Sequence, residues 1–306
     1  MHKNVTPLKV WIGVISIFFI TQILIYINIE SDKKTSQLAS TFDMLYKEME
    51  ESFNSADSSV IKIAVIGTSL TGHGISCSDD IRDYAQRNYG VNIELRKIFF
   101  LSDNFRYFVE KRELLKKLIQ LDVDIIMIQT EALAVQLDYQ SKKSQLPLNI
   151  IRILSQKNRE FIQIGEKAQN EKNSYLEECY PRSAFELPST IDTLFDIKAK
   201  PRNIKSEKEV AFSFEDLKAC KENGIQVIML DFPRPYKVEQ MARTPFFNKS
   251  LEKLAQEYQE EFGIEHWTFD ETMYFNQFRD YAHLNATGRE VFTTWLVDEI
   301  VKEKSR

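Results

Sequence analysis

The stretch that decides the fold is IKIAVIGTSLTG, residues 61–72. Its first part is rich in β-branched and apolar side chains, which predicts a buried strand over 61–66. Gly67 then allows a sharp turn, and a helical pattern follows over 75–89. Such a turn holds the hydroxyl of Ser69 at the carboxyl edge of the strand, where a nucleophile would sit. Taken alone, however, the Thr-Ser pair is better explained as the N-cap of the next helix.

A second segment, DYAHLN (residues 280–285), supplies the groups that a serine nucleophile needs. The spacing of three lets Asp280 and His283 lie on one side of a turn. One imidazole nitrogen can then meet the carboxylate while the other faces Ser69. The chain order is nucleophile, orienting acid and base, which indicates hydrolytic or acyl-transfer chemistry. The alternative is an exposed aspartate and a histidine at a helix start, with Asn285 as the cap.

The two segments together resemble the SGNH (GDSL-like) hydrolase superfamily. In that family the nucleophile lies in a Gly-Asp-Ser or Gly-Ser-Ser turn after the first strand, and the final block reads Asp-x-x-His. The resemblance covers roughly residues 59–300. It implies an α/β fold in which Ser69 is the nucleophile, His283 the base and Asp280 the residue that orients the imidazole.

The chain departs from this family at the oxyanion hole. Family members usually add a glycine after the second strand and an asparagine after the third, whereas this chain has LSDN (101–104) and QTE (129–131) there. The side-chain amides of Asn104 and Gln129 and the backbone N–H of Ser69 are the remaining donors. Glu131 would oppose an oxyanion unless it were protonated or turned away.

Two further residues complete the candidates for oxyanion or substrate binding, Gly67 and Arg234. Arg234 follows a predicted strand and could bind an anionic group, or it could be a salt-bridged arginine in a proline-fixed loop. His73, one helical turn after Ser69, is expected to line the cleft or to be an ordinary polar helix position. His266 is expected on the surface.

Strand and helix periods alternate along the rest of the chain, which predicts an α/β fold: a doubly wound, mostly parallel sheet in an SGNH/flavodoxin-like three-layer arrangement. The expected further strands cover 91–100, 124–128, 225–230 and 264–269, and the expected further helices cover 105–121, 214–223 and 291–304. Gly224 is expected at the end of the second of these helices. Residues 138–208 exceed a simple crossover and are interpreted as an insertion, either a lid or partner surface or a mere decoration.

The N-terminal region is predicted to anchor the protein. Residues 10–29 carry no charge and are long enough for a transmembrane helix behind a short leader, residues 1–9. A cleaved signal peptide is the competing interpretation, but no small-x-small cleavage site follows the apolar run. Residues 30–58 are interpreted as a helical stalk before the domain at 59–306. Its apolar stripe is too short for a coiled coil and is expected to pack on the chain's own domain; it comprises Leu38, Phe42, Leu45, Met49 and Phe53.

Composition narrows the classes of partner and cofactor. The net charge of −5 gives no broad basic surface, so no nucleic-acid partner is expected. Four scattered histidines without HExxH-like spacing indicate no metal site, and neither a P-loop nor a dinucleotide fingerprint indicates a cofactor. One pair among Cys77, Cys179 and Cys220 could form a disulfide, or all three could be unpaired.

These observations predict a single-pass protein of the cytoplasmic membrane with its C-terminal domain outside. The expected activity is that of a serine esterase or O-acyltransferase acting on an acyl group, most simply acetyl, of a cell-envelope glycan. A transferase would receive its acyl group from a partner, for instance a multi-spanning membrane acyltransferase. The rival hypothesis is a non-catalytic envelope scaffold on the same fold, favoured by the missing oxyanion residues.

Overall fold

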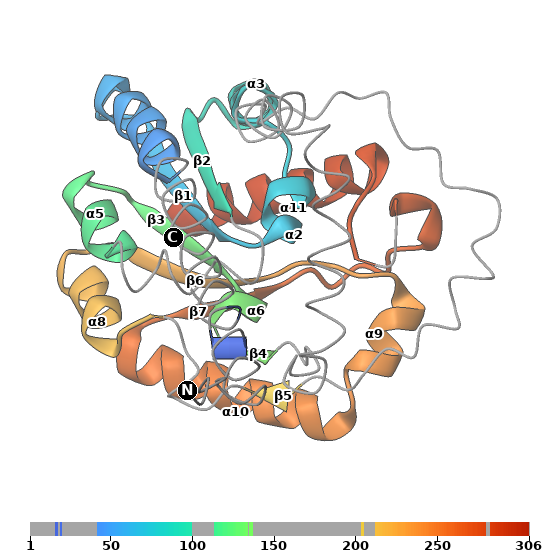
Figure 1. The fold of residues 1–306 in the computed structure, drawn as a ribbon. Helices are drawn as coiled ribbons and strands as arrows, with labels where there is room; N and C mark the ends of the chain where they lie inside the picture. Colours follow the sequence, from blue (N-terminus) through green and yellow to red (C-terminus); the bar gives the residue numbers. More distant parts are fainter. Residues whose placement is uncertain are drawn as a thin grey trace, which may run out of the picture. The chain divides into compact units, whose positions relative to one another are not determined.

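The structure is a computed structural model that describes residues 16, 17, 19, 42–99, 113–133, 135–136, 203–204, 212–279 and 282–305 (Figure 1). The chain divides into two units, Met1–Glu48 and Met49–Arg306, and each is described by itself.

The first unit contributes few described residues. Ser16, Ile17 and Phe19 are helical, and the side chains of Ile17 and Phe19 are exposed. The remainder of the predicted anchor lies outside the described residues. Within the part of the chain that the structure describes, no helix is both long and apolar enough to cross a membrane.

Residues 42–55 form a helix, as predicted for the stalk. Four positions of its apolar stripe are buried, namely Phe42, Leu45, Met49 and Phe53, whereas Leu38 lies outside the described residues. In the second unit this helix meets the sheet edge, because Ser52 bonds to Glu94 and accepts a hydrogen bond from Arg96 Nε at 3.0 Å.

The second unit is built on a five-stranded parallel sheet, which confirms the predicted fold class. The strand order is β2-β1-β3-β6-β7, so the chain starts in the middle of the sheet and winds outward in both directions (Figure 1). Ile63 of β1 is in register with Ile93 of β2 and with Ile125 of β3. The strands are β1 (Ile61–Gly67), β2 (Ile93–Phe99), β3 (Ile125–Gln129), β6 (Gln226–Asp231) and β7 (Glu265–Thr268).

Helices cover both faces of the sheet. On one face α11 contacts α2 and α3, and on the other α8 contacts α5 and α10 (Figure 1). Both faces of β3 are buried, which explains its uninterrupted apolar sequence. The helices are α2 (Ser69–Gly74), α3 (Ser78–Tyr89), α5 (Leu114–Gln120), α8 (Phe214–Glu222), α10 (Pro245–Phe262) and α11 (Ala286–Lys304).

The core between the sheet and α11 shows the expected alternation. Ile63 and Val65 of β1 share one buried cluster with Phe292, Leu296 and Ile300 of α11. Because side chains alternate along a strand, the intervening Ala64 and Ile66 serve the opposite face.

The structure corrects the predicted helices in three places. The helix predicted over 75–89 begins later, as α3 at Ser78, and an additional short helix, α2, precedes it; the backbone at Ile75 between them is extended (φ −116°, ψ 139°). Two further helices were not predicted, α9 (Tyr236–Ala242) and α10. Gly224 does follow α8 with a positive φ of 73°, as its predicted place at the helix end requires.

The predicted insertion at 138–208 lies outside the described residues except for β5 (Asn203–Ile204). This strand pairs antiparallel with β4 (Val135–Gln136), just beyond the short helix α6 (Thr130–Leu133) that follows β3. The pairing therefore joins the chain soon after β3 to the chain shortly before α8.

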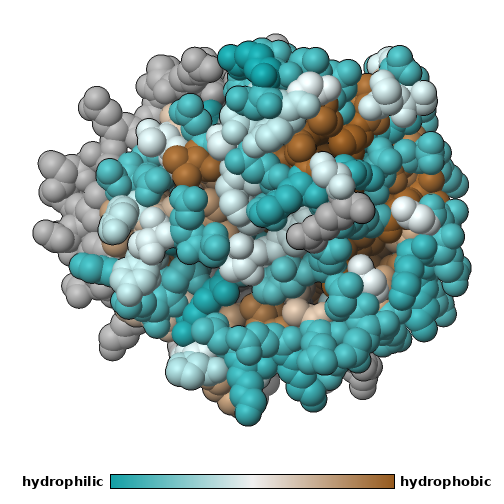
Figure 2. Space-filling model, turned by 180° about the vertical axis from the view of Figure 1, so that it is seen from behind, coloured by the Kyte–Doolittle hydropathy of each residue, from teal (hydrophilic) through white to brown (hydrophobic). Residues whose placement is uncertain are grey.

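Hydrophilic residues cover most of the face seen from behind, and apolar residues show between them in separate places (Figure 2). The exposed large apolar side chains of the second unit come from different helices and loops: Tyr89, Tyr236, Met241, Phe246 and Tyr274. Isolated exposed apolar residues of this kind are ordinary on a protein surface.

Candidate active site

Ser69 lies where the sequence predicted it, at the carboxyl end of β1, an inner strand of the sheet. It is the first residue of α2, and Thr68 before it has extended backbone angles (φ −104°, ψ −160°). The side chain of Thr68 makes no capping hydrogen bond to α2, so the explanation of the Thr-Ser pair as a simple N-cap does not hold. Ser69 is half-buried.

The structure brings Ser69 and His283 together. His283 Nε2 lies 2.9 Å from Ser69 Oγ, although the two residues are 214 positions apart in the chain. This is the distance that a general base needs to take the hydroxyl proton of a nucleophile. Asp280, predicted to orient the imidazole, lies outside the described residues.

A short hairpin loop holds His283 in place. The backbone N–H of Arg279 donates to the carbonyl of His283 at 2.9 Å, and Phe278 pairs with Leu284 in an isolated bridge. Asn285 then caps α11, because its Oδ1 accepts from the N–H of Gly288 at 3.0 Å. Asn285 is thus the N-cap of α11, as one of the two interpretations expected, and this cap sets where the helix begins after His283.

His73 lies beside the predicted base. Its ring centroid is 5.3 Å from that of His283, and the two rings are nearly perpendicular at 85°. The last turn of α2 positions this ring, and Gly72 before it packs against the ring of Phe99 so closely that a Cβ would lie 2.5 Å from it. Of the two interpretations of His73, the structure favours a residue that lines the site.

Gln129, a predicted oxyanion donor, is engaged with the turn that carries Ser69. Its Oε1 accepts from the backbone N–H of Thr68 at 2.8 Å and from the hydroxyls of Thr68 and Thr71 at 3.0 and 3.1 Å. Its Nε2 donates to Glu131 Oε2 at 3.0 Å. Buried at the end of β3, Gln129 holds the turn that carries Ser69 through its oxygen, and one of its two amide N–H groups is used by Glu131.

Arg234 is also engaged with the protein itself. It donates to Glu131 Oε1 at 2.8 Å, and both side chains are largely buried. Burial would lower the pKa of Arg234, but Glu131 outweighs it and the pKa is raised. The ion pair also turns Glu131 away from its predicted conflict with an oxyanion. The salt-bridged arginine, one of the two alternatives, is therefore what the structure shows.

Gly67 has a steric role. A Cβ at this position would lie 2.0 Å from Thr71 Oγ1 and 2.5 Å from Gln129 Oε1. Only glycine leaves room for the hydrogen bonds between Gln129 and the turn. The fourth candidate for the oxyanion or substrate, Asn104, lies outside the described residues.

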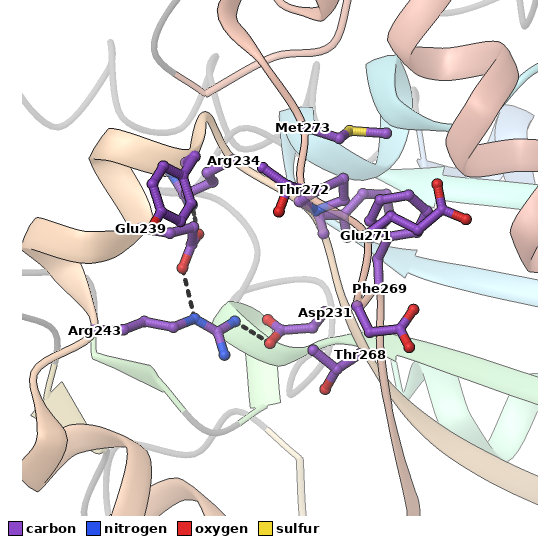
Figure 3. A pocket seen from close by; sticks show the side chains of 13 residues that line it. Asp231, Arg234, Glu239, Arg243, Thr268, Phe269, Glu271, Thr272 and Met273 are labelled. Atoms are coloured by element: carbon purple, nitrogen blue, oxygen red, sulfur yellow. Dashed lines mark hydrogen bonds and ion pairs between the residues drawn. The ribbon is translucent and has the colours of Figure 1, made fainter.

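Sequence reasoning missed a buried cluster of charges at the end of β6. Asp231 forms an ion pair with Arg243, and His266 Nε2 lies 3.7 Å from Asp231 Oδ2 (Figure 3). Burial would raise the pKa of Asp231, but His266 and the Arg243 charge hold it at about 2. His266, predicted on the surface, has a side chain only 18% exposed. The feature of the sequence that could have indicated this cluster is Asp231, an acidic residue at the end of a strand predicted to be buried.

The described residues contain no group of three His, Cys, Asp or Glu side chains that could hold a metal ion. Cys77 is disulfide-bonded, and Cys220 is a buried free cysteine whose pKa burial raises to about 12.

Comparisons with known proteins add likenesses of fold. No family model matches the chain, and no curated protein matches it. Among solved structures, a proposed acylhydrolase of Bacteroides fragilis is 11% identical, with 85% of this chain and 96% of that chain covered at a TM-score of 0.37. A GDSL-like lipase of Bacteroides thetaiotaomicron is 11% identical, with 85% and 98% covered at a TM-score of 0.35. The lipase/acylhydrolase of Enterococcus faecalis is 14% identical, with 79% and 96% covered at a TM-score of 0.35. The function proposed for this chain is therefore based on its own strand order and on the geometry of its site.

Proposed function

We propose that this chain is a serine-dependent esterase or O-acyltransferase of the SGNH type. The observation that carries the proposal is the 2.9 Å contact between Ser69 Oγ and His283 Nε2 at the carboxyl end of β1. Ligands bind at this end of the strands in doubly wound sheets.

The reaction would proceed through an acyl-enzyme. Ser69 Oγ attacks the acyl carbonyl carbon while His283 Nε2 takes the hydroxyl proton, and a C–O bond to serine forms. The leaving alcohol then departs with the proton from His283. In the second half, water or an acceptor hydroxyl gives its proton to His283 and attacks the acyl carbon. The bond from this carbon to Ser69 Oγ then breaks, and His283 returns the proton to Ser69 Oγ. Asp280 is proposed to hold the imidazole in the required orientation.

The oxyanion of each tetrahedral intermediate needs hydrogen-bond donors. Because Gln129 is engaged with the turn, we propose that the backbone N–H of Ser69 at the start of α2 is the main donor among the described residues. One missing donor typically costs about 10²–10³ in rate. Turnover is therefore expected to be slow compared with that of an esterase with a complete oxyanion hole.

The proposed setting is the outer face of a cytoplasmic membrane. The uncharged run over 10–29 would be the anchor, and the exposed apolar side chains of Ile17 and Phe19 fit a segment that contacts lipid. The disulfide at Cys77 fits an oxidising compartment. The proposed substrate is an acyl group, most simply acetyl, on a cell-envelope glycan, and in the transferase variant a multi-spanning membrane acyltransferase would supply it.

One observation favours a second candidate, a non-catalytic envelope scaffold. Gln129, which stands where the family carries its oxyanion asparagine, is committed to the Thr68 turn. A site that keeps the serine and histidine without a competent oxyanion hole would bind partners but not turn over esters.

The test uses the full-length chain in a sugar-free detergent, with p-nitrophenyl acetate for turnover and a fluorophosphonate for covalent labelling. Variants Ser69→Ala and His283→Ala should abolish turnover, and Ser69→Ala should abolish labelling. Ser250→Ala is the matched control, because Ser250 is an exposed serine on α10 whose hydroxyl bonds only within its helix. A folded wild-type chain without labelling or turnover would support the scaffold instead.

A further inference from the structure

A cavity of about 280 Å³ opens at the carboxyl ends of β6 and β7 (Figure 3). Its walls are the end of β6 with the loop that follows, the helix α9, and the segment after β7 up to Met273. No residue of the Ser69–His283 pair lines it. The volume lies at the lower end for small-molecule sites and suits one ring-sized group.

A buried carboxylate oxygen in this cavity is unsatisfied. Asp231 is 2% exposed and lines the cavity. Its Oδ2 side is paired with Arg243, but Oδ1 has no hydrogen-bond partner in the part of the chain that the structure describes. Since the pKa of Asp231 is held at about 2, the group is ionised near neutral pH. A buried anionic oxygen without a hydrogen-bond donor is energetically unfavourable. A hydroxyl or amine of a ligand that donates a hydrogen bond to this oxygen would therefore be stabilised there.

A buried donor accompanies this acceptor. Arg234 also lines the cavity, and its Nε makes no hydrogen bond within the described residues, although Glu239 Oε1 lies 3.9 Å away. The cavity thus offers an acceptor at Asp231 and a donor at Arg234. A hydroxyl group can satisfy either one, because it both donates and accepts.

The other residues that line the cavity disfavour a free anion and favour an uncharged ring. Four carboxylates stand against the two arginines, and both arginines already form ion pairs, so a free anion is disfavoured. Beside Asp231, Arg243 compensates the carboxylate charge, so a cation gains little from that group. The exposed ring of Tyr236 and the hydroxyl of Thr268 lie at the walls, where one can cover the C–H face of a ring and the other can bond its edge.

The cavity is connected to the candidate active site through a chain of hydrogen bonds. Arg234 donates to Glu131 at 2.8 Å, Gln129 donates to Glu131 at 3.0 Å, and Gln129 accepts from the N–H of Thr68 at 2.8 Å. Thr68 immediately precedes Ser69. A group bound against Arg234 therefore touches the same rigid network that positions the nucleophile.

We infer that this cavity is a saccharide subsite, which binds one hydroxyl-rich ring of the glycan through Asp231, Arg234 and Thr268, with Tyr236 at its rim. The assignment of the ring to the acylated glycan rests on the proposed function. Binding of the ring itself does not, since it requires no chemistry at Ser69.

The experiment is ligand-observed saturation-transfer NMR on the full-length chain in a sugar-free detergent. The probes are methyl β-D-glucopyranoside and methyl N-acetyl-β-D-glucosaminide, with inorganic phosphate and choline as the anionic and cationic comparisons. We expect saturation transfer to at least one glycoside and none to choline, and no competition by phosphate. Thr268→Val and Tyr236→Ala should each weaken binding by about two- to ten-fold. Phe246→Ala, at an even more exposed aromatic at the start of α10 and outside the cavity, should leave it unchanged.

The outcomes separate this inference from the proposed function. Glycoside binding that persists in Ser69→Ala supports the subsite whether or not the wild type turns over esters. Ester turnover without glycoside binding, binding that Thr268→Val and Tyr236→Ala leave intact, or competition by phosphate or choline would each overturn the subsite.

Discussion

Gln129 and Thr68 are joined by a hydrogen bond of 2.8 Å from the backbone N–H of Thr68 to the side-chain oxygen of Gln129. This bond connects the end of β3 to the turn after β1, one residue before Ser69. The side chain of Gln129 thus serves as a brace for the turn that carries Ser69. The brace continues through Glu131 to Arg234, so four residues on three segments share one network.

Replacing Gln129 by alanine should loosen this turn. The variant leaves the Thr68 N–H buried without its acceptor, which typically costs about 1–3 kcal/mol of unfolding free energy. Displacement of Ser69 relative to His283 should also lower kcat for p-nitrophenyl acetate by about 10–100-fold. Urea unfolding and ester kinetics on the same preparations check both effects.

Gln256→Ala is the control for this variant, because Gln256 is an exposed glutamine whose amide bonds only to Glu260 on the same helix. It should change stability by less than about 0.5 kcal/mol and leave kcat unchanged. A Gln129→Ala protein as stable and active as this control would show that the brace has no role in the site.

Gly67→Ala should damage the same turn by a steric route. The new methyl group would lie 2.0 Å from Thr71 Oγ1 and 2.5 Å from Gln129 Oε1, so one of these side chains has to move. Overpacking of this kind typically costs about 1–3 kcal/mol. We expect lower stability and a loss of Ser69 labelling by the fluorophosphonate.

Gly90→Ala provides the comparison for this steric effect. Gly90 has a positive φ of 66°, but a Cβ there meets nothing within 4 Å. Alanine at Gly90 should therefore cost about 1 kcal/mol through the backbone alone and leave labelling intact. Equal labelling in the two variants would count against crowding at Gly67.

The sheet could be predicted from the sequence because each central strand is buried on both faces. The apolar runs at β1, β3 and β6 have no competing period, and the Ser69 turn and the His283 loop follow from motifs at their ends. The helix α10 was not predicted from the sequence. Only four of its residues are buried, Phe247, Leu251, Tyr258 and Phe262, and charged and polar residues fill the rest of its length.

The roles of the site's polar side chains could not be predicted from the sequence. Whether the amide of Gln129 faces an oxyanion or the Thr68 turn depends on how closely β3 lies beside β1, which the sequence does not encode locally. The ion pair of Asp231 and Arg243 likewise depends on tertiary structure that the sequence does not encode locally. It exists because α9 returns the chain so that Arg243 meets the end of β6 twelve positions back.

The stability of the protein should fall in acid because of Asp231. Its pKa is about 2 in the folded chain, below the usual value of about 3.9 for an unfolded aspartate. The depressed pKa contributes stability that is present above pH ~4 and is lost as the pH falls through about 2, of order 2 kcal/mol. Asp231→Asn should remove this part of the pH dependence and lower stability at pH 7, because Arg243 loses its buried partner.

Denaturant unfolding at pH 7, 4, 3 and 2 measures this dependence, with Asp79→Asn as the matched variant. Asp79 pairs with Arg82 on the surface and is 82% exposed on its side chain, so its removal should leave the curve parallel to that of the wild type. If Asp231→Asn and the wild type lose stability in parallel between pH 4 and 2, Asp231 is not the group that titrates.

The last prediction concerns the cysteines. Burial raises the pKa of Cys220 to about 12, so the folded chain at pH 8 should react with a thiol reagent such as DTNB only as fast as it unfolds. The sequence has three cysteines, and the disulfide at Cys77 takes up two sulfurs. Unfolding in urea without reductant should therefore expose one thiol per chain, and reduction should expose three. Cys220→Ala should reduce the number of thiols exposed without reductant to zero.

Rapid reaction of the folded chain would contradict the burial of Cys220. Three thiols without reductant would show that Cys77 is unpaired, and would remove one of the supports for a domain that faces an oxidising compartment.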